Sequence, residues 1–130
     1  MHRYDADRAP VAEEWLDSDE DERVEAVERY HLVRHVELPD LHIHAVMHTI
    51  AENQVALRED ATVRALRRLM AEGLTRHDAI HAIAAVNINF IFKTLRGEAD
   101  WPEEDTNRLI REALDELTAE KWLSGGVNGD

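Results

Sequence analysis

Histidines spaced four residues apart are the residues of this sequence with the clearest chemical potential. His44 and His48 form one pair, with Glu52 following at the same spacing, and His77 and His81 form another. Residues four apart on a helix share one face, about 6 Å apart along the axis, so two imidazoles can converge on one ion. The sequence therefore predicts a metal site made of His44, His48, Glu52, His77 and His81.

The type of ligand limits which metal such a site would bind. Nitrogen ligands combined with a carboxylate suit divalent transition metals, namely Zn, Fe, Mn, Ni or Co, and spacing does not choose among them. The chain has no cysteine, which excludes thiolate sites and disulfides. Neither the HExxH motif of zinc proteases nor the Glu-x-x-His repeat of di-iron bundles occurs, so the site belongs to a different type.

A third pair, His31 and His35, lies upstream of the other two. Val24, Val27 and His31 fall on one helical stripe, and His35 continues it, which points these imidazoles inward. Near the end of a helix the same side chains could instead cap backbone carbonyl groups. His31 and His35 are thus either additional metal ligands or capping groups.

The helix that carries His77 and His81 is the most apolar stretch of the chain, residues 76–95. Thr75 is expected to cap its start, with Asp78 three residues further on. A helix that is apolar on every side is usually buried, and a buried imidazole without a partner costs free energy. Metal binding would supply the missing partner, whereas a polar core in which histidines bond to each other or to Glu52 would be the alternative.

Apolar residues at helical spacing, separated by short polar breaks, predict an all-α fold: a single-domain bundle of about five helices with a buried fourth helix. The domain is expected to cover residues 1–130, with residues 1–13 and 124–130 as mobile tails, except that Tyr4 could dock on the ordered part. In the second helix His42 is expected to face solvent. The core stripe of that helix is expected to consist of Ile43, Met47, Ile50, Gln54 and Leu57. The five helices are expected to begin near Ser18, Asp40, Asp60, Thr75 and Pro102.

Charge and hydropathy narrow the possible partners. The net charge of −13 disfavours nucleic acid, because neutralising phosphates supplies most of that affinity. No signal peptide and no transmembrane stretch is recognisable, which predicts a cytoplasmic protein that does not enter a membrane. The sequence allows a homo-oligomer and identifies no protein partner. Arg64, Arg67 and Arg68 are expected to form a solvated face.

The sequence resembles a bacterial family of small helical proteins known only as a domain of unknown function. The motifs that carry the resemblance are LHIHAVMHTIAENQVAL, RLMAEGLTRHDAIHAI and the upstream VERYH, within residues 14–86. The family pattern has a small residue, often Gly, where this chain has Ala84. The resemblance implies a helical fold and supports the selection of the same histidines as site residues. It implies no particular activity.

Three functions are compatible with these patterns. The first is a metal-binding bundle, in which an open coordination position could activate water; whether it is an enzyme stays open, because no nucleophile or substrate motif is visible. The second is an interaction or structural module with a polar histidine core. The third is a helix–turn–helix regulator spanning residues 65–83, which the acidic charge and the apolar second helix argue against.

Overall fold

All secondary structure within the described residues, 4–33 and 41–124 of this computed structural model, is helical. The order is α1 (Ala12–Asp17), α2 (Glu20–Val33), α3 (Leu41–Ala56), α4 (Asp60–Ala71), α5 (Arg76–Leu95), a 3-10 turn η1 (Glu103–Asp105), α6 (Thr106–Glu116) and α7 (Ala119–Leu123). The prediction of an all-α fold is confirmed. The expected count of about five helices misses α1 and α7, which are too short to show a repeating apolar stripe.

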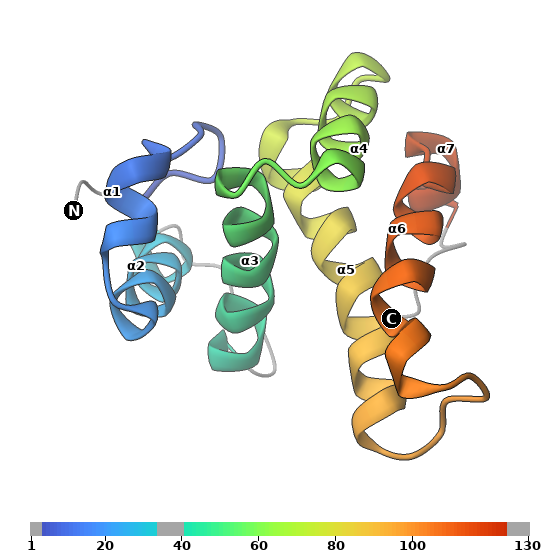
Figure 1. The fold of residues 1–130 in the computed structure, drawn as a ribbon. Helices are drawn as coiled ribbons and strands as arrows, with labels where there is room; N and C mark the ends of the chain where they lie inside the picture. Colours follow the sequence, from blue (N-terminus) through green and yellow to red (C-terminus); the bar gives the residue numbers. More distant parts are fainter. Residues whose placement is uncertain (1–3, 34–40, 125–130) are drawn as a thin grey trace.

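The helices α3 and α5 lie side by side in the middle of the molecule (Figure 1). Helix α2 packs on α3, and α6 packs on α5, while α4 contacts both α5 and α6. One apolar cluster therefore forms around α5, and a second joins the N-terminal segment, α1 and α2 to α3. The expected burial of the fourth long helix is confirmed over its first three turns, where Ile80, Ile83 and Val86 are buried.

The turn into α5 fixes the position of the residues that follow it. Gly73 has φ 109°, a left-handed conformation that side chains other than glycine rarely adopt, and it ends α4. Thr75 then caps α5, because its Oγ1 accepts a hydrogen bond from the Asp78 backbone N–H at 3.1 Å. This cap was expected from the sequence, and it sets Arg76 and His77 in the first turn of α5.

The face of α3 turned to the core differs from the expected one. Ile43 and Leu57 are exposed, 40% and 59%, although both were expected in the core stripe. Because α3 lies between α2 and α5, it buries two faces, and these carry small and polar residues. The fully or almost fully buried residues of α3 are Ala45, His48, Thr49, Ala51 and Glu52.

The N-terminal segment is part of the fold from residue 4 onward, which corrects the expectation of a mobile tail over residues 1–13. Tyr4 and Ala6 are buried, and Tyr4 packs against Trp15 and Tyr30 with ring centroids 5.6 and 5.5 Å apart. The segment is short and polar, so it has no periodicity that could reveal a docking role. Residues 125–130 of the expected C-terminal tail lie outside the described residues.

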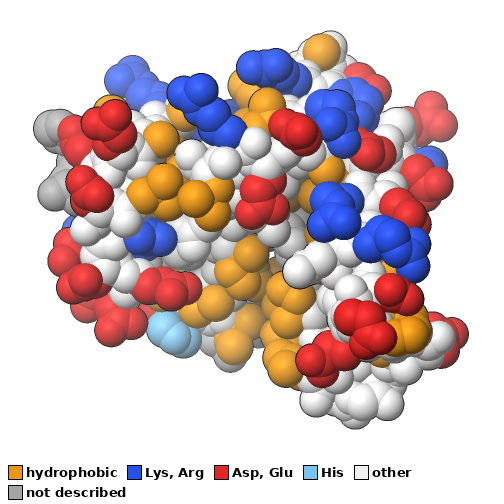
Figure 2. Space-filling model, viewed as in Figure 1, with side chains coloured by type: hydrophobic (Ala, Val, Ile, Leu, Met, Phe, Trp, Pro, Cys, Tyr) orange, Lys and Arg blue, Asp and Glu red, His pale blue; other side chains and the backbone are white. Residues whose placement is uncertain are grey.

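Charged side chains cover much of the surface, with basic ones gathered over α4 (Figure 2). Arg64 and Arg67 are exposed as expected. Arg68 is not simply solvated, because it donates hydrogen bonds to the carbonyl oxygens of Leu114 and Leu117, at 2.6 and 2.8 Å, where α6 ends. Within the described residues no helix is both long and apolar enough to span a bilayer.

Candidate metal site

Three helices bring five histidines together, and these five are called the histidine cluster: His31 from α2, His44 and His48 from α3, and His77 and His81 from α5. His48 stands at its centre. Its ring centroid lies 4.4 Å from His44, 5.1 Å from His31, 5.3 Å from His81 and 5.4 Å from His77. The two predicted pairs do converge, and His31 joins them.

His48 is fully buried, and neither of its ring nitrogens has a hydrogen-bond partner among the described residues. A neutral imidazole has one donor and one acceptor nitrogen, and burying such groups without partners costs on the order of 1–3 kcal/mol each. A protein that keeps this side chain in its core needs a partner that offsets this free-energy cost. A metal ion can compensate, because it accepts the lone pair of an imidazole nitrogen.

Two overlapping groups of nitrogens have the geometry to hold a metal ion. The inner group consists of His31, His48 and His77, of which His31 and His48 are buried. The outer group consists of His44, His48 and His81, of which only His48 is buried. In each group the ligand atoms lie within 4.8 Å of one another.

Two nitrogens bound to one tetrahedral ion at 2.0–2.1 Å are about 3.3 Å apart, so binding would draw the rings of a group slightly closer. Imidazole side chains reach such positions by small rotations about their side-chain bonds. The backbone positions set by α2, α3 and α5 therefore already suit coordination.

The surroundings keep these imidazoles neutral, which is the form that binds metal. Burial, followed by the proximity of His81, lowers the pKa of His44 from 6.5 to about 4. Burial and the neighbouring His44 lower the pKa of His48 well below 6.5. The pKa of His81 is also lowered, first by burial and then by His77, although Asp78 opposes the shift. At neutral pH protons therefore compete only weakly for these three ligands.

Other contacts orient the inner group. His31 Nδ1 donates a hydrogen bond to the Val27 carbonyl oxygen at 2.8 Å, since a carbonyl can only accept. This bond places the ring proton on Nδ1 and leaves the lone pair on Nε2, as a hydrogen bond to the second nitrogen does in many metal-bound histidines. Tyr30 packs edge-on against both His31 and His77, with ring centroids 5.4 Å away in each case.

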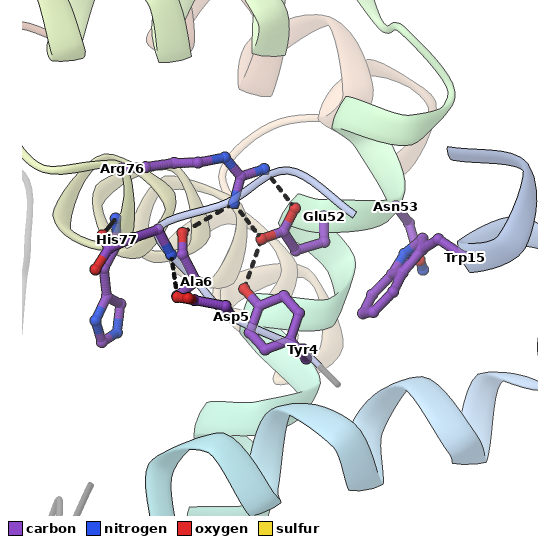
Figure 3. A network of polar contacts seen from close by, with 9 residues as sticks. Tyr4, Asp5, Ala6, Trp15, Glu52, Asn53, Arg76 and His77 are labelled. Carbon is purple, nitrogen blue, oxygen red and sulfur yellow. Dashed lines mark hydrogen bonds and ion pairs between the residues drawn. The ribbon is translucent and has the colours of Figure 1, made fainter. Parts of the chain in front are cut away.

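Glu52 lies apart from both histidine groups, which differs from its expected role as a ligand. Its two carboxylate oxygens each accept a hydrogen bond from Arg76, at 2.7 Å, and the Tyr4 hydroxyl donates to Oε2 at 2.5 Å (Figure 3). Arg76 also donates to the Ala6 carbonyl oxygen at 2.9 Å. Tyr4, Glu52 and Arg76 form what is called the ion-pair cluster, and Glu52 belongs to neither of the two groups that could hold a metal ion.

Charge and burial explain why the ion-pair cluster holds together. The side chains of Arg76 and Glu52 are 5% and 0% exposed, so each charge needs the other. Burial would lower the pKa of Arg76, but hydrogen bonding to and charge pairing with Glu52 raise it. The pKa of the Tyr4 hydroxyl is raised by burial and by the Glu52 charge, so it remains a donor.

The remaining polar residues singled out from the sequence lie elsewhere. His35 falls outside the described residues. His42 is exposed, as expected, and its Nδ1 lies 2.6 Å from the Glu28 carboxylate. Asn87, a polar residue of the apolar helix α5, is a satisfied buried amide. It exchanges hydrogen bonds with Gln54 at 2.9 and 3.1 Å, and it belongs to neither histidine group.

Sequence reasoning missed three residues near the site: Tyr4, Arg76 and Trp122. Arg76 was treated only as the polar boundary of the apolar helix. Its position directly before His77 gave no signal of its partner, because consecutive side chains of a helix point about 100° apart. Trp122 of α7 packs on His81 with ring centroids 5.5 Å apart and covers the outer group from that side.

No protein-family model matches the chain, and neither a curated protein nor a solved structure matches it. The resemblance to a bacterial domain of unknown function consequently stays a prediction. The candidate function rests on the geometry of the histidine cluster.

Proposed function

We propose that this protein binds a divalent transition metal in its histidine cluster, with His31, His44, His48, His77 and His81 as ligands. One observation carries the proposal: at the centre of the five rings, fully buried His48 has two ring nitrogens without a partner among the described residues. A set of ligands made only of imidazoles suits Zn, Ni or Co, and it also suits Cu and Fe.

The alternative of a metal-free polar core is less well supported by the same observation. In a satisfied core, His48 would exchange hydrogen bonds with its neighbours, as Asn87 does with Gln54. Its ring instead lies close to four other imidazoles, and burial keeps it neutral. Lone pairs gathered in this way repel one another unless a cation or a proton lies between them.

The helix–turn–helix alternative meets a structural difficulty. Helices α4 and α5 are joined by a turn at Gly73, but α5 packs against α3, α4 and α6. A recognition helix has to be free to enter the major groove. We therefore propose that the protein does not bind nucleic acid.

The outer group suggests where chemistry could occur. Three protein ligands leave a tetrahedral ion one open position, the arrangement typical of catalytic zinc sites. His44 and His81 are partly exposed, so water can reach an ion that they hold. Such an ion could activate water or bind a small external ligand, and the proposal leaves the reaction open.

Metal content tests the proposal. Protein produced without a His tag and supplied with Zn²⁺, Ni²⁺ or Co²⁺ should retain at least one ion per chain after gel filtration. His48→Ala should lose most of this metal, whereas His42→Ala, which removes an exposed histidine paired with Glu28, should not. Equal retention by the two variants would overturn the proposed ligand set.

A further inference from the structure

Resting on the proposed function, we infer that the histidine cluster holds two metal ions and that His48 bridges them. His48 belongs to both groups, whereas the other four histidines each belong to one. The inner ion would be bound by His31, His48 and His77, and the outer ion by His44, His48 and His81. Each ion would then have three protein nitrogens.

An imidazole has two ring nitrogens. Their lone pairs lie in the ring plane and point away from each other, so a single ion can engage only one of them. Both nitrogens of His48 are buried, and neither has a partner among the described residues. A single ion would therefore leave one of them unsatisfied, whereas two ions satisfy both.

The other histidines surround His48, and the two groups also meet, since the ring centroids of His31 and His44 lie 4.8 Å apart. His31 and His77 contact each other, with ring centroids 5.4 Å apart, and His44 and His81 do so at 4.8 Å. Each of these pairs joins residues from two helices, α2 with α5 in the inner group and α3 with α5 in the outer group. One ion per pair would thus tie α5 to α2 and to α3 separately.

Proton balance is simple in this arrangement. Neutral His48 carries one ring proton, and that proton must leave for solvent when the second ion binds, because its nitrogen then donates to the metal. The resulting imidazolate carries one negative charge, which offsets part of the charge of two dications.

The two sites differ in their access to solvent. His31 and His48 of the inner group are buried, so the inner ion would be shielded and held mainly for structure. The outer group has two partly exposed rings and would be the place where an external ligand reaches a metal. His48 would thus bridge a buried ion and an ion that is accessible to solvent.

Stoichiometry provides the first test. Apo protein titrated with Zn²⁺ should bind two ions per chain by elemental analysis, as should the control variant His42→Ala. His31→Ala and His81→Ala should each retain one ion, and His48→Ala should lose tight binding at both sites. A buried alanine leaves a cavity, so His48→Gln, with circular dichroism to check the fold, would accompany it.

Loading with Cu²⁺ provides a second test that depends on the bridge itself. Two Cu²⁺ ions joined by an imidazolate are magnetically coupled, so the ordinary copper resonance should weaken as the second ion binds. His81→Ala, with one copper, should show the ordinary signal at full intensity.

The outcomes separate the inference from the proposed function. No bound ion in the wild type would overturn both. One ion per chain that is lost in His48→Ala would overturn the bridge and leave the metal site intact. Two ions with two uncoupled copper signals, or two ions retained in His48→Gln, would also overturn the bridge.

Discussion

Two buried polar clusters lie next to each other on the same pair of helices, and they are built on opposite principles. In the ion-pair cluster, the Glu52 carboxylate is matched by the Arg76 guanidinium and the Tyr4 hydroxyl. In the histidine cluster, one helical turn before Glu52 on α3, His48 has no hydrogen-bond partner among the described residues. The first cluster is satisfied by the chain itself, and the second is not.

The difference shows how burial can be read as a sign of function. Equal burial of a polar side chain has different meanings depending on whether the fold supplies its partners. A cluster whose charges pair with each other has a structural role, because removing either charge would leave the other buried without a partner. A buried imidazole such as His48, whose two nitrogens have no hydrogen-bond partner among the described residues, points to something that binds there. Substitutions in one cluster therefore test whether the other cluster responds.

Breaking the ion pair should have the largest effect on stability. Arg76→Ala leaves the buried Glu52 charge without its partner and should lower the free energy of unfolding by about 3–5 kcal/mol. Urea denaturation of the metal-free protein measures this loss. Arg64→Ala is the matched control, since Arg64 makes a paired contact with Asp115 at the exposed surface and its removal should scarcely change stability.

Metal content should distinguish the two clusters in the same variant. If Arg76→Ala still folds at low temperature, it should bind as much metal as the wild type, because the guanidinium of Arg76 bonds to Glu52 and Ala6. A complete loss of metal from a folded Arg76→Ala protein would show that the clusters act as one site.

Removing the metal should have the next largest effect. A ligand that binds only the folded state stabilises it by about 3 kcal/mol when its concentration is a hundred times its dissociation constant. A chelator should therefore lower the melting temperature of the wild type by several degrees, while helical circular dichroism at room temperature hardly changes. The apolar contacts around α5 keep the metal-free bundle folded.

The double variant His44→Ala, His81→Ala is the control for chelation. It retains the ion-pair cluster and loses the two ligands found only in the outer group. Its melting temperature should respond to chelator less than that of the wild type, because only the inner group is left to hold an ion. Identical melting curves for wild-type protein before and after confirmed metal loss would remove any link between the metal and the stability of the fold.

Acid should weaken the histidine cluster through its pKa values. The pKa of His44 is about 4 in the folded protein and 6.5 in the unfolded chain, so the unfolded chain binds more protons between these values. The contribution of His44 to the stability of the metal-free protein is therefore present above pH 6.5 and is lost as pH falls toward 4. For His44 alone the loss between pH 7 and pH 5 is about 2 kcal/mol.

Urea denaturation at pH 7 and pH 5 tests this dependence. His44→Ala should show a smaller difference between the two pH values than the wild type, and His42→Ala should not. Metal affinity should also fall in acid, because protons compete for the same nitrogens. An affinity that stays constant down to pH 4 would argue against histidine ligands.

The sequence predicted the positions of the five long helices and four of the five clustered histidines as ligands. These features depend on local rules: helical periodicity, the cap at Thr75 and the spacing of His44, His48, His77 and His81. His31 was left between two roles, because its stripe pointed inward while its place near a helix end suggested capping. Only the packing of α2 on α3 decides where its ring lies.

The errors at the site concern contacts between distant parts of the chain. Glu52 shares a helical stripe with His44 and His48, so spacing alone suggested a ligand. Its actual partner is 24 residues away, and the Tyr4 hydroxyl that completes the cluster is 48 residues away. Helical periodicity does not encode pairs so far apart in the sequence. In addition, an arginine at the start of an apolar helix is usually exposed, so Arg76 was not expected to be buried. Which of two polar stripes faces a metal is thus decided by tertiary contacts.

The smallest expected effect concerns the segment that joins the two clusters. The carbonyl oxygen of Ala6 accepts from Arg76, and the next residue, Asp7, accepts from the backbone N–H of His77 at 3.1 Å. This carboxylate satisfies one of the free N–H groups at the start of α5 and interacts favourably with the positive end of the helix dipole. The bond is exposed to water, so Asp7→Ala should lower the free energy of unfolding by about 1 kcal/mol or less.

Thr75→Ala is the matched control for Asp7→Ala, because Thr75 caps the neighbouring Asp78 N–H of the same helix turn. Both variants should cost a similar amount in urea denaturation, and both should retain the full metal content. The reason is that the His77 ring is held by Tyr30, His31 and His48, which neither substitution touches. If Asp7→Ala lost an ion while Thr75→Ala kept it, the N-terminal segment would be shaping the inner group, and the histidine cluster could no longer be treated as independent of the chain that covers it.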